Sequence, residues 1–168
     1  MKKIIQGKAY VFGNNIDTDQ IYPGRYLELT EAPDIAKHVL EGADSSFAGR
    51  YLPGGIVVGG RNFGCGSSRE HAAIAIKAAG IPLVVAESFA RIFYRNCINL
   101  GLPLLVCPGI SAACKEGDEL SIDIEAGTVR NLSSGITLKG QGLSEYVWKI
   151  LSAGGIKPLL RAEISSRG

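Results

Sequence analysis

The chain has 168 residues, of which 46% are hydrophobic and 20% are charged, which is ordinary for a soluble globular protein. Its net charge is +2 and its Lys and Arg residues form no dense cluster, so nucleic acid is not expected as the main partner. No apolar run approaches the roughly 20 residues of a membrane span. The basic start at Met1–Gly7 leads into no long apolar segment. We therefore expect one domain over residues 1–168, located in the cytoplasm and not bound to a membrane.

Glycine and cysteine usage adds two expectations. The 22 glycines are spread along the chain, which favours many tight turns and close backbone approaches. None of the four cysteines forms a C-x-x-C pair, and the chain has only two histidines. We therefore expect free, mostly buried thiols and no metal or cluster site built by this chain alone. The cysteines are Cys65, Cys97, Cys107 and Cys114.

The N-terminal third predicts one strand and one short helix. Lys8–Phe12 has the pattern of a strand, and the polar Gly13–Asp19 follows it with turn chemistry. Pro33–Glu41 favours a helix for which Thr30 is a plausible cap. Asp44–Gly55 is expected to be a loop.

The middle third alternates strands and helices, which predicts a parallel sheet with right-handed crossovers. Its short apolar strands are typical of strands covered on both faces. A serine, Ser88, is positioned to cap the second of the two helices. The expected segments are strands at Ile56–Val58, Pro82–Ala86 and Leu102–Cys107, and helices at Ala72–Ala79 and Phe89–Cys97.

The C-terminal third changes character. Alternating apolar and polar residues predict an antiparallel meander over Glu119–Glu125, Thr128–Arg130 and Ile136–Leu138. Ser144 is expected to cap a further helix that closes at Gly154. The last residues, 156–168, are expected to be a tail of uncertain order.

The stretch Gly64–His71 places two glycines, two hydroxyls, a guanidinium, a carboxylate and an imidazole between a predicted strand and a predicted helix. Ser67 and Glu70 have the spacing of a capping box, and Ser68 is an alternative cap. An arginine in the first helical turn, Arg69, is unfavourable against the helix dipole. Its presence there indicates an anion, which a guanidinium can hold with two parallel hydrogen bonds.

Two other interpretations of the stretch Gly64–His71 compete with a carboxylate-binding site. The pattern Gly64-x-Gly66, with Glu87 about 20 residues further on, has part of a dinucleotide fingerprint. Against it, Arg69 occupies the third glycine position, and the lysine of a Walker A loop is also absent. Cys65 beside two glycines invites a nucleophile interpretation, but no second histidine neighbours it in the sequence.

Other polar residues have both structural and functional interpretations. Asp17–Asp19 is either an Asx-type turn or the source of a carboxylate that orients a catalytic histidine. His71 is expected to satisfy a hydrogen bond in the first helical turn. Arg91 and Arg95, four residues apart, are expected to form surface or interface ion pairs.

Three motifs in order carry a resemblance to a known family. Asp17–Ile21, Gly64–His71 and Ala86–Asn96 closely resemble the 3-isopropylmalate dehydratase small-subunit family, which is similar to the swivelling domain of aconitase. The resemblance runs from about Lys8 to Leu160. It implies an α/β fold, a single three-layer β/β/α swivelling domain of the aconitase C-terminal type, with a parallel core plus antiparallel strands.

The resemblance also implies a hydro-lyase reaction in leucine biosynthesis, the interconversion of 2- and 3-isopropylmalate by dehydration and rehydration. In that family the first serine of the motif is the base, which corresponds to Ser67. Ser68 and Arg69, with Gly66 beside them, match carboxylate-binding positions. Asp19 matches an aspartate that pairs with a catalytic histidine of the other part of the enzyme.

A cofactor and a partner follow from the same resemblance. Family members use a 4Fe-4S cluster held by three cysteines of a large subunit, and this chain lacks a matching set. We therefore expect a chain that binds no cofactor itself and is active only with a large subunit, as a heterodimer or heterotetramer. The substrate, a small hydroxy dicarboxylate, would lie between the two subunits.

The loop after the first motif bears on the choice of substrate. Relatives that act on tricarboxylates carry an arginine where this chain has Glu28, which would repel a third carboxylate. Leu29 is expected to touch an isopropyl group. Both favour isopropylmalate over homocitrate. A homoaconitase-type or citraconate-type small subunit is the alternative, and a stand-alone module that binds a nucleotide or a carboxylate is a further one.

Overall fold

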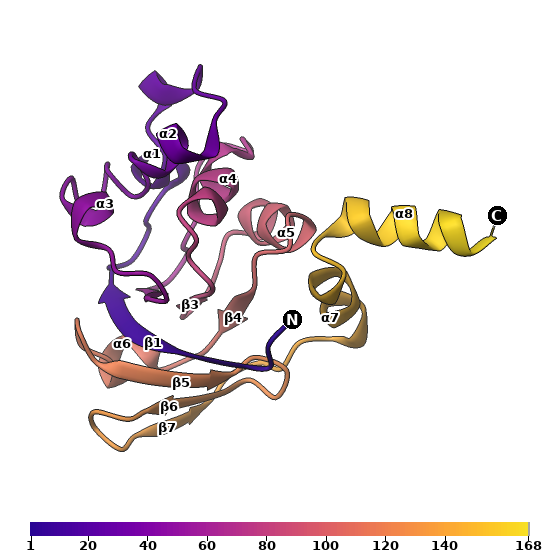
Figure 1. The fold of residues 1–168 in the computed structure, drawn as a ribbon. Helices are drawn as coiled ribbons and strands as arrows, with labels where there is room; N and C mark the ends of the chain where they lie inside the picture. The colour runs from indigo at the N-terminus through magenta and orange to yellow at the C-terminus, as the bar shows by residue number, and fades with distance from the viewer. Residues whose placement is uncertain (168) are drawn as a thin grey trace.

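Seven strands form one continuous sheet in the computed structural model of the chain, which describes residues 1–167 (Figure 1). The strand order is β4-β3-β2-β1-β5-β6-β7. The first four strands in that order run parallel, and the remaining neighbours pair antiparallel. The strands are β1 (Ile4–Val11), β2 (Ile56–Gly59), β3 (Val84–Ala86), β4 (Leu104–Val106), β5 (Glu119–Asp123), β6 (Thr128–Asn131) and β7 (Thr137–Lys139).

Strand β1 belongs to both halves of the sheet. Its C-terminal part pairs in parallel with β2, in the register Ala9 to Ile56. Its N-terminal part pairs antiparallel with β5, in the register Ile5 to Ile122. One eight-residue strand therefore links the parallel core to the meander. The strand is longer at its N-terminus than the predicted Lys8–Phe12, because the residues before Lys8 find partners on β5.

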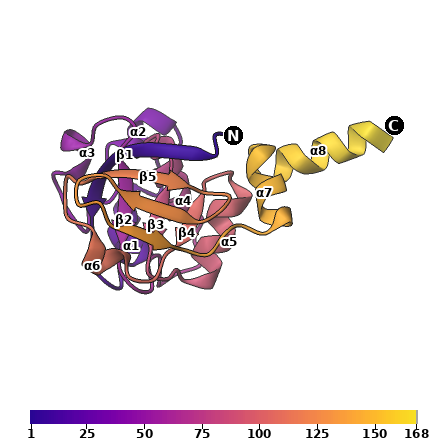
Figure 2. The ribbon, with the colours of Figure 1, turned by 90° about the horizontal axis from the view of Figure 1, so that it is seen from below.

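The parallel strands separate two cores. Val57 and Val84 lie in the core shared with the helices, whereas Val58 and Val85 lie in a second core shared with the antiparallel strands. This alternation follows from the period of two along a strand. Figures 1 and 2 show helices on one side of the parallel strands and the meander curling across the other. The predicted three-layer β/β/α arrangement is confirmed.

The helices are mostly short. Their bounds are α1 (Thr18–Ile21), η1 (Gly24–Tyr26), α2 (Ala32–Ala36), α3 (Phe47–Arg50), α4 (His71–Ala78), α5 (Arg91–Asn99), α6 (Ile110–Ala113), α7 (Glu145–Ser152) and α8 (Ile156–Arg167). Within the described part of the chain, no helix is long and apolar enough to cross a membrane.

Several local predictions need correction. The helix expected over Pro33–Glu41 spans Ala32–Ala36 instead. Its N-cap residue is Glu31 and no side chain caps it, so Thr30 is not the cap. The expected loop at Asp44–Gly55 contains α3. Ser88 does not cap α5, because its Oγ accepts a hydrogen bond from the backbone of Asn62 instead. The prediction missed α6.

The C-terminal residues form an ordered helix, so the prediction of a tail is wrong for 156–167, while Gly168 lies outside the described residues. Helix α8 is held at its start, where Leu159 packs with Ile98, Ile150 and Leu151. The remainder projects away from the body of the molecule (Figure 2). The cap at Ser144 is confirmed, since its Oγ accepts from the backbone N–H of Val147 at 3.2 Å.

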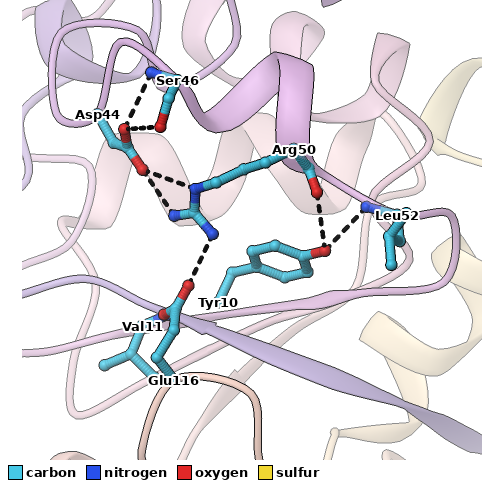
Figure 3. Close-up of polar contacts among 7 residues, drawn as sticks. All are labelled: Tyr10, Val11, Asp44, Ser46, Arg50, Leu52 and Glu116. Carbon is cyan, nitrogen blue, oxygen red and sulfur yellow. Dashed lines mark hydrogen bonds and ion pairs between the residues drawn. The ribbon is translucent and has the colours of Figure 1, made fainter.

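A polar network ties α3 to the sheet (Figure 3). Arg50 donates to Asp44 Oδ2 through Nε at 3.1 Å and Nη2 at 2.6 Å, and to Glu116 Oε1 through Nη1 at 2.8 Å. Tyr10 on β1 donates to the Arg50 carbonyl and accepts from the backbone N–H of Leu52. Three separate segments are joined here, so the network fixes α3 against β1 and the turn before β5.

Candidate active site

Two loops meet where the parallel strands end. The backbone of Gly64 donates to Ile16 at 2.7 Å, and the backbone of Thr18 donates to Cys65 at 2.8 Å. These hydrogen bonds continue the β1–β2 pairing beyond the strands. As a result, Ser67 lies beside Thr18 although 49 residues separate them.

The hydroxyl of Ser67 makes hydrogen bonds with two side chains. Arg69 Nε donates to Ser67 Oγ at 3.0 Å, and Thr18 Oγ1 lies 3.3 Å from the same oxygen. The backbone N–H of Ser67 donates to Thr18 Oγ1 at 3.2 Å. Thr18 is buried whereas Ser67 is exposed. The buried threonine therefore anchors a serine that is open to solvent and next to a positive charge.

The predicted capping role of Ser67 or Ser68 is wrong. Helix α4 begins at His71 after Glu70, and no side chain caps it. Ser67 Oγ is instead engaged by Arg69 and Thr18. Arg69 also lies before the helix rather than in its first turn, so the argument from the helix dipole does not apply to it. The contact with Ser67 accounts for its position.

Two glycines shape the loop that carries Ser67. Gly64 and Gly66 have φ angles of +87° and +107°, which side chains other than that of glycine rarely adopt. A Cβ on Gly64 would lie 2.2 Å from Phe93 Cγ, and one on Gly66 would lie 3.1 Å from Thr18 Oγ1. The close approaches predicted from the glycines are thus to the protein's own side chains.

Asp19 and Arg69 both lie close to Gly24. Its Oδ1 accepts from the Gly24 backbone at 2.9 Å. A Cβ built on Gly24 would lie 3.5 Å from Arg69 Nη1 and 3.6 Å from Asp19 Oδ1. Asp17 takes the structural role that was one of the two interpretations, because it caps α1 in a capping box with Gln20. Asp19 remains exposed to solvent.

The remaining predicted site residues are placed less closely. Ser68 is exposed, and its carbonyl accepts from Asn96 Nδ2 at 3.4 Å. Leu29 is partly buried against the core shared with the helices. The structure thus brings Ser67, Arg69, Gly66 and Asp19 together, whereas the role of Leu29 stays a prediction. Thr18 was missed because only its contact with Ser67, distant in sequence, distinguishes it.

A cleft of about 510 Å³ opens beside Ser67. Its lining includes Gly66, Asn62, Arg91 and Arg95. Over residues 1–167, no ion pair joins Arg91 or Arg95 to a carboxylate, so the expected surface pairs are not formed within the chain. The cleft is therefore rich in positive charge that the chain itself does not neutralise.

Glu87 does not support the dinucleotide alternative. Its carboxylate accepts from the backbone N–H groups of Gly109 at 2.8 Å and Ser111 at 3.0 Å. The side chain therefore satisfies the start of α6, and the carboxylate that a ribose would need is already occupied.

The cysteines are free, and most are buried. Burial raises the pKa of Cys107 to about 11 and that of Cys114 to about 12, and it raises the pKa of Cys97 well above its ordinary value. Within residues 1–167, no three Cys, His, Asp or Glu side chains are grouped to hold a metal ion. The described residues do not fit a 4Fe-4S cluster.

His71 differs from its prediction. Its Nδ1 is buried and has no hydrogen-bond partner among the described residues. The ring stacks on Tyr22, with a centroid separation of 6.3 Å. The expected hydrogen bond in the first helical turn is therefore not made through Nδ1.

This arrangement defines a class of protein. A serine hydroxyl held by a guanidinium and a threonine lies at the carboxyl end of a parallel sheet, within a stretch of the chain that a family model matches. The model for the aconitase C-terminal domain matches residues 13–108. The chain belongs to the aconitase C-terminal domain family.

Particular relatives match almost the whole chain. The isopropylmalate/citramalate isomerase small subunit of Methanocaldococcus jannaschii is 54% identical over 165 residues, 98% of each chain. The 3-isopropylmalate dehydratase small subunit 1 of Methanopyrus kandleri is 53% identical, covering 97% of this chain and 96% of its own. The methanogen homoaconitase small subunit of Methanothermobacter thermautotrophicus is 48% identical, covering 93% and 90%.

A solved structure agrees with the fold. The crystal structure of a 3-isopropylmalate dehydratase from Methanocaldococcus jannaschii superposes with a TM-score of 0.92 at 41% identity. The match covers 98% of this chain and 99% of the other.

Proposed function

We propose that this chain is the small subunit of a 3-isopropylmalate dehydratase, a hydro-lyase of leucine biosynthesis, and supplies half of a divided active site. Relatives with that name are 53% and 50% identical to it over nearly its full length. The observation that carries the proposal is the pairing of an exposed Ser67 hydroxyl with Arg69 at 3.0 Å.

Ser67 acts as the base in this proposal. A serine hydroxyl is a weak base in water, and its alkoxide needs positive charge and hydrogen-bond donors nearby. Arg69 Nε and the Thr18 hydroxyl lie within 3.3 Å of Ser67 Oγ and supply both. Ser67 then takes a proton from the carbon next to a substrate carboxylate as the hydroxyl group leaves from the neighbouring carbon. The isomer forms when water adds to the resulting double bond in the opposite sense: the proton goes to the carbon that lost the hydroxyl, and the hydroxyl goes to the carbon that lost the proton.

Arg69, Ser68 and Gly66 bind the substrate carboxylate. The guanidinium uses Nε for Ser67, and its terminal nitrogens remain for an anion. Ser68 lies next to it and is exposed, so its hydroxyl is open to the same carboxylate. Asp19, which is exposed and accepts a hydrogen bond from the Gly24 backbone, pairs with a histidine of the partner in this proposal.

The reaction needs a second protein. The 4Fe-4S cluster that the family uses is assigned to a large subunit, since the described residues do not fit one. When bound, that cluster supplies a Lewis acid for the leaving hydroxyl. The active complex is a heterodimer or heterotetramer of the two subunits, and the substrate lies between them.

The substrate is proposed to be isopropylmalate. Glu28 and Leu29 lie on the segment after η1. Glu28 is exposed and Leu29 is partly buried, so this segment presents a negative charge beside an apolar side chain. A third carboxylate is disfavoured there by charge repulsion. A smaller dicarboxylate such as citramalate is the second candidate, because a 54% identical relative carries isopropylmalate and citramalate in its name.

The organisation and location of the chain complete the proposal. Residues 1–168 act as one swivelling domain. The free thiols agree with a reducing compartment such as the cytoplasm.

The test is reconstitution with the cluster-bearing large subunit from the same source. The mixture is expected to dehydrate isopropylmalate fastest and citramalate more slowly, and to hydrate homoaconitate least. Preference for homoaconitate would overturn the assignment based on Glu28. Tight nucleotide binding by the chain alone, without dehydratase activity in the mixture, would support a binding module instead.

A further inference from the structure

Two clefts share the exposed surface of α5. One contains Ser67, and the other, of about 440 Å³, lies between α5 and α7. Phe89, Arg91 and Arg95 line both clefts, so the two clefts lie next to each other at the start of α5. We call the exposed residues that border them, Arg91, Ile92, Arg95 and Tyr146, the α5–α7 face.

The charge of this face is not balanced within the chain. Arg91 and Arg95 stand one helical turn apart, where like charges repel and destabilise a helix. Neither forms an ion pair with a carboxylate in residues 1–167. By contrast, Arg50 uses its whole guanidinium on two carboxylates of the chain. Two free guanidinium groups fit a partner surface that carries carboxylates, which arginine can bind with two hydrogen bonds.

The same face also leaves apolar side chains in solvent. Ile92 is 50% exposed and Tyr146 is 62% exposed. The second cleft is lined mainly by apolar and aromatic groups, including Tyr94, Ile98 and Val147. Exposed aromatic and aliphatic groups around a hollow, with arginines beside them, have the composition of a protein interface.

We propose that the α5–α7 face is the docking surface for the large subunit. Its counterpart is a segment with one apolar side chain that enters the α5–α7 cleft and carboxylates that reach Arg91 and Arg95. This inference rests on the proposed function, which requires a second subunit at Ser67. The shared lining of the two clefts favours that partner, because a protein seated on Arg91 and Arg95 also covers the cleft beside Ser67.

The experiment measures the dissociation constant of this chain for the large subunit at several salt concentrations. Arg91→Glu/Arg95→Glu is compared with Lys2→Glu/Arg130→Glu, which makes the same charge change at exposed residues outside both clefts. Tyr146→Ala is compared with Ile136→Ala, at a residue that is 44% exposed and outside both clefts. Circular dichroism checks that each variant is folded.

The arginine double variant is expected to weaken association at least about tenfold at low salt and to flatten its salt dependence. Tyr146→Ala is expected to weaken association with the salt dependence unchanged. Both controls should bind like the wild type.

Three results would overturn the proposal. The variants of the α5–α7 face could bind the large subunit as tightly as the controls do. The arginine double variant could bind with unchanged affinity while its KM for substrate rises, which would make the arginines substrate ligands. The isolated chain could self-associate through this face, which would make a second copy the occupant. Failure of the proposed function is distinguishable, because a wild-type complex would then form without dehydratase activity.

Discussion

Arg69 Nε donates a hydrogen bond to Ser67 Oγ at 3.0 Å, and this contact gives the serine a fixed positive neighbour. Hydrogen bonds to charged groups contribute about 1.5–3 kcal/mol. In the proposed reaction a neighbouring guanidinium favours the alkoxide over the hydroxyl, so changes at either residue test the role of the pair.

Ser67→Ala should remove the base. The turnover number of the reconstituted enzyme is expected to fall by at least about 10²-fold to 10⁴-fold, the range for a positioned acid–base group. The affinity for the large subunit should not change, because a small exposed side chain is lost. Steady-state kinetics and a binding titration check both, with Ser45→Ala as the control. Turnover close to that of the wild type would remove Ser67 from this role.

Arg69→Lys should keep the charge but lose the contact through Nε. We expect kcat/KM to fall about 10-fold to 100-fold, in proportion to one charge-assisted hydrogen bond. We also expect the pH–rate profile to shift to higher pH, which a purely structural effect of the substitution would not cause. A less stabilised alkoxide raises the pKa of the base, so the rate should rise at higher pH than in the wild type. An unshifted profile would argue against the contact.

Thr18→Val should remove the hydrogen bond that anchors the backbone of Ser67. Thr18 is 6% exposed and its Oγ1 accepts from the backbone N–H of Ser67 at 3.2 Å. Valine has a similar shape but leaves that N–H without its partner, at a cost of about 1–2 kcal/mol in the free energy of unfolding. Turnover should fall as well, because Ser67 loses its anchor. Denaturant unfolding and kinetics test this, with Thr137→Val as an exposed control.

Gly64→Ala and Gly135→Ala form a matched pair. Both glycines have a left-handed φ, of +87° and +80°. An added methyl at Gly64 meets Phe93 Cγ at 2.2 Å, whereas nothing lies within 4 Å at Gly135. Gly135→Ala should therefore cost only the backbone strain of about 1–2 kcal/mol. Gly64→Ala should cost clearly more in chemical denaturation, and equal costs would show that Phe93 yields.

The network of Figure 3 predicts part of the acid sensitivity. Arg50, and then Ser46, hydrogen-bond Asp44 and hold the pKa of its carboxyl below the ordinary 3.8. Since the folded pKa is depressed, this stabilisation is complete above 3.8 and is lost as the pH falls through the lower folded value. The difference in unfolding free energy between the wild type and Asp44→Asn should therefore be smaller when measured below pH 3.8 than at about pH 7. A constant difference would contradict this account.

The parallel core could be predicted from the sequence because its signals are local. Val84–Ala86 lies within a short apolar run, and a strand covered on both faces needs such a run. Helix α8 was missed because residues at a chain end are often poorly ordered unless tertiary contacts hold them, and the contacts of Leu159 with Ile98 and Ile150 are visible only in the fold. Proline is tolerated in the first turn of a helix, where its missing N–H would have no partner, and Pro158 is the third residue of α8.

The sequence indicated which residues to consider for the site but not the contacts that they make. The motif Gly64–His71 indicated an anion site, yet it also predicted a helix cap at Ser67 that is not formed. The competing contact comes from Thr18, 49 residues away, and no local pattern reports it. The spacing of Arg91 and Arg95 likewise suggested ion pairs, and only the folded surface shows that neither has a partner within the described chain.

The most direct test of a divided active site is the turnover of isopropylmalate by each subunit alone and by their mixture. Turnover is expected only in the mixture, rising with added small subunit until the binding sites of the large subunit are filled. Replacing the wild-type chain by Ser67→Ala should give a complex that forms but does not turn over. Activity of either subunit alone, or full activity with Ser67→Ala, would contradict the account.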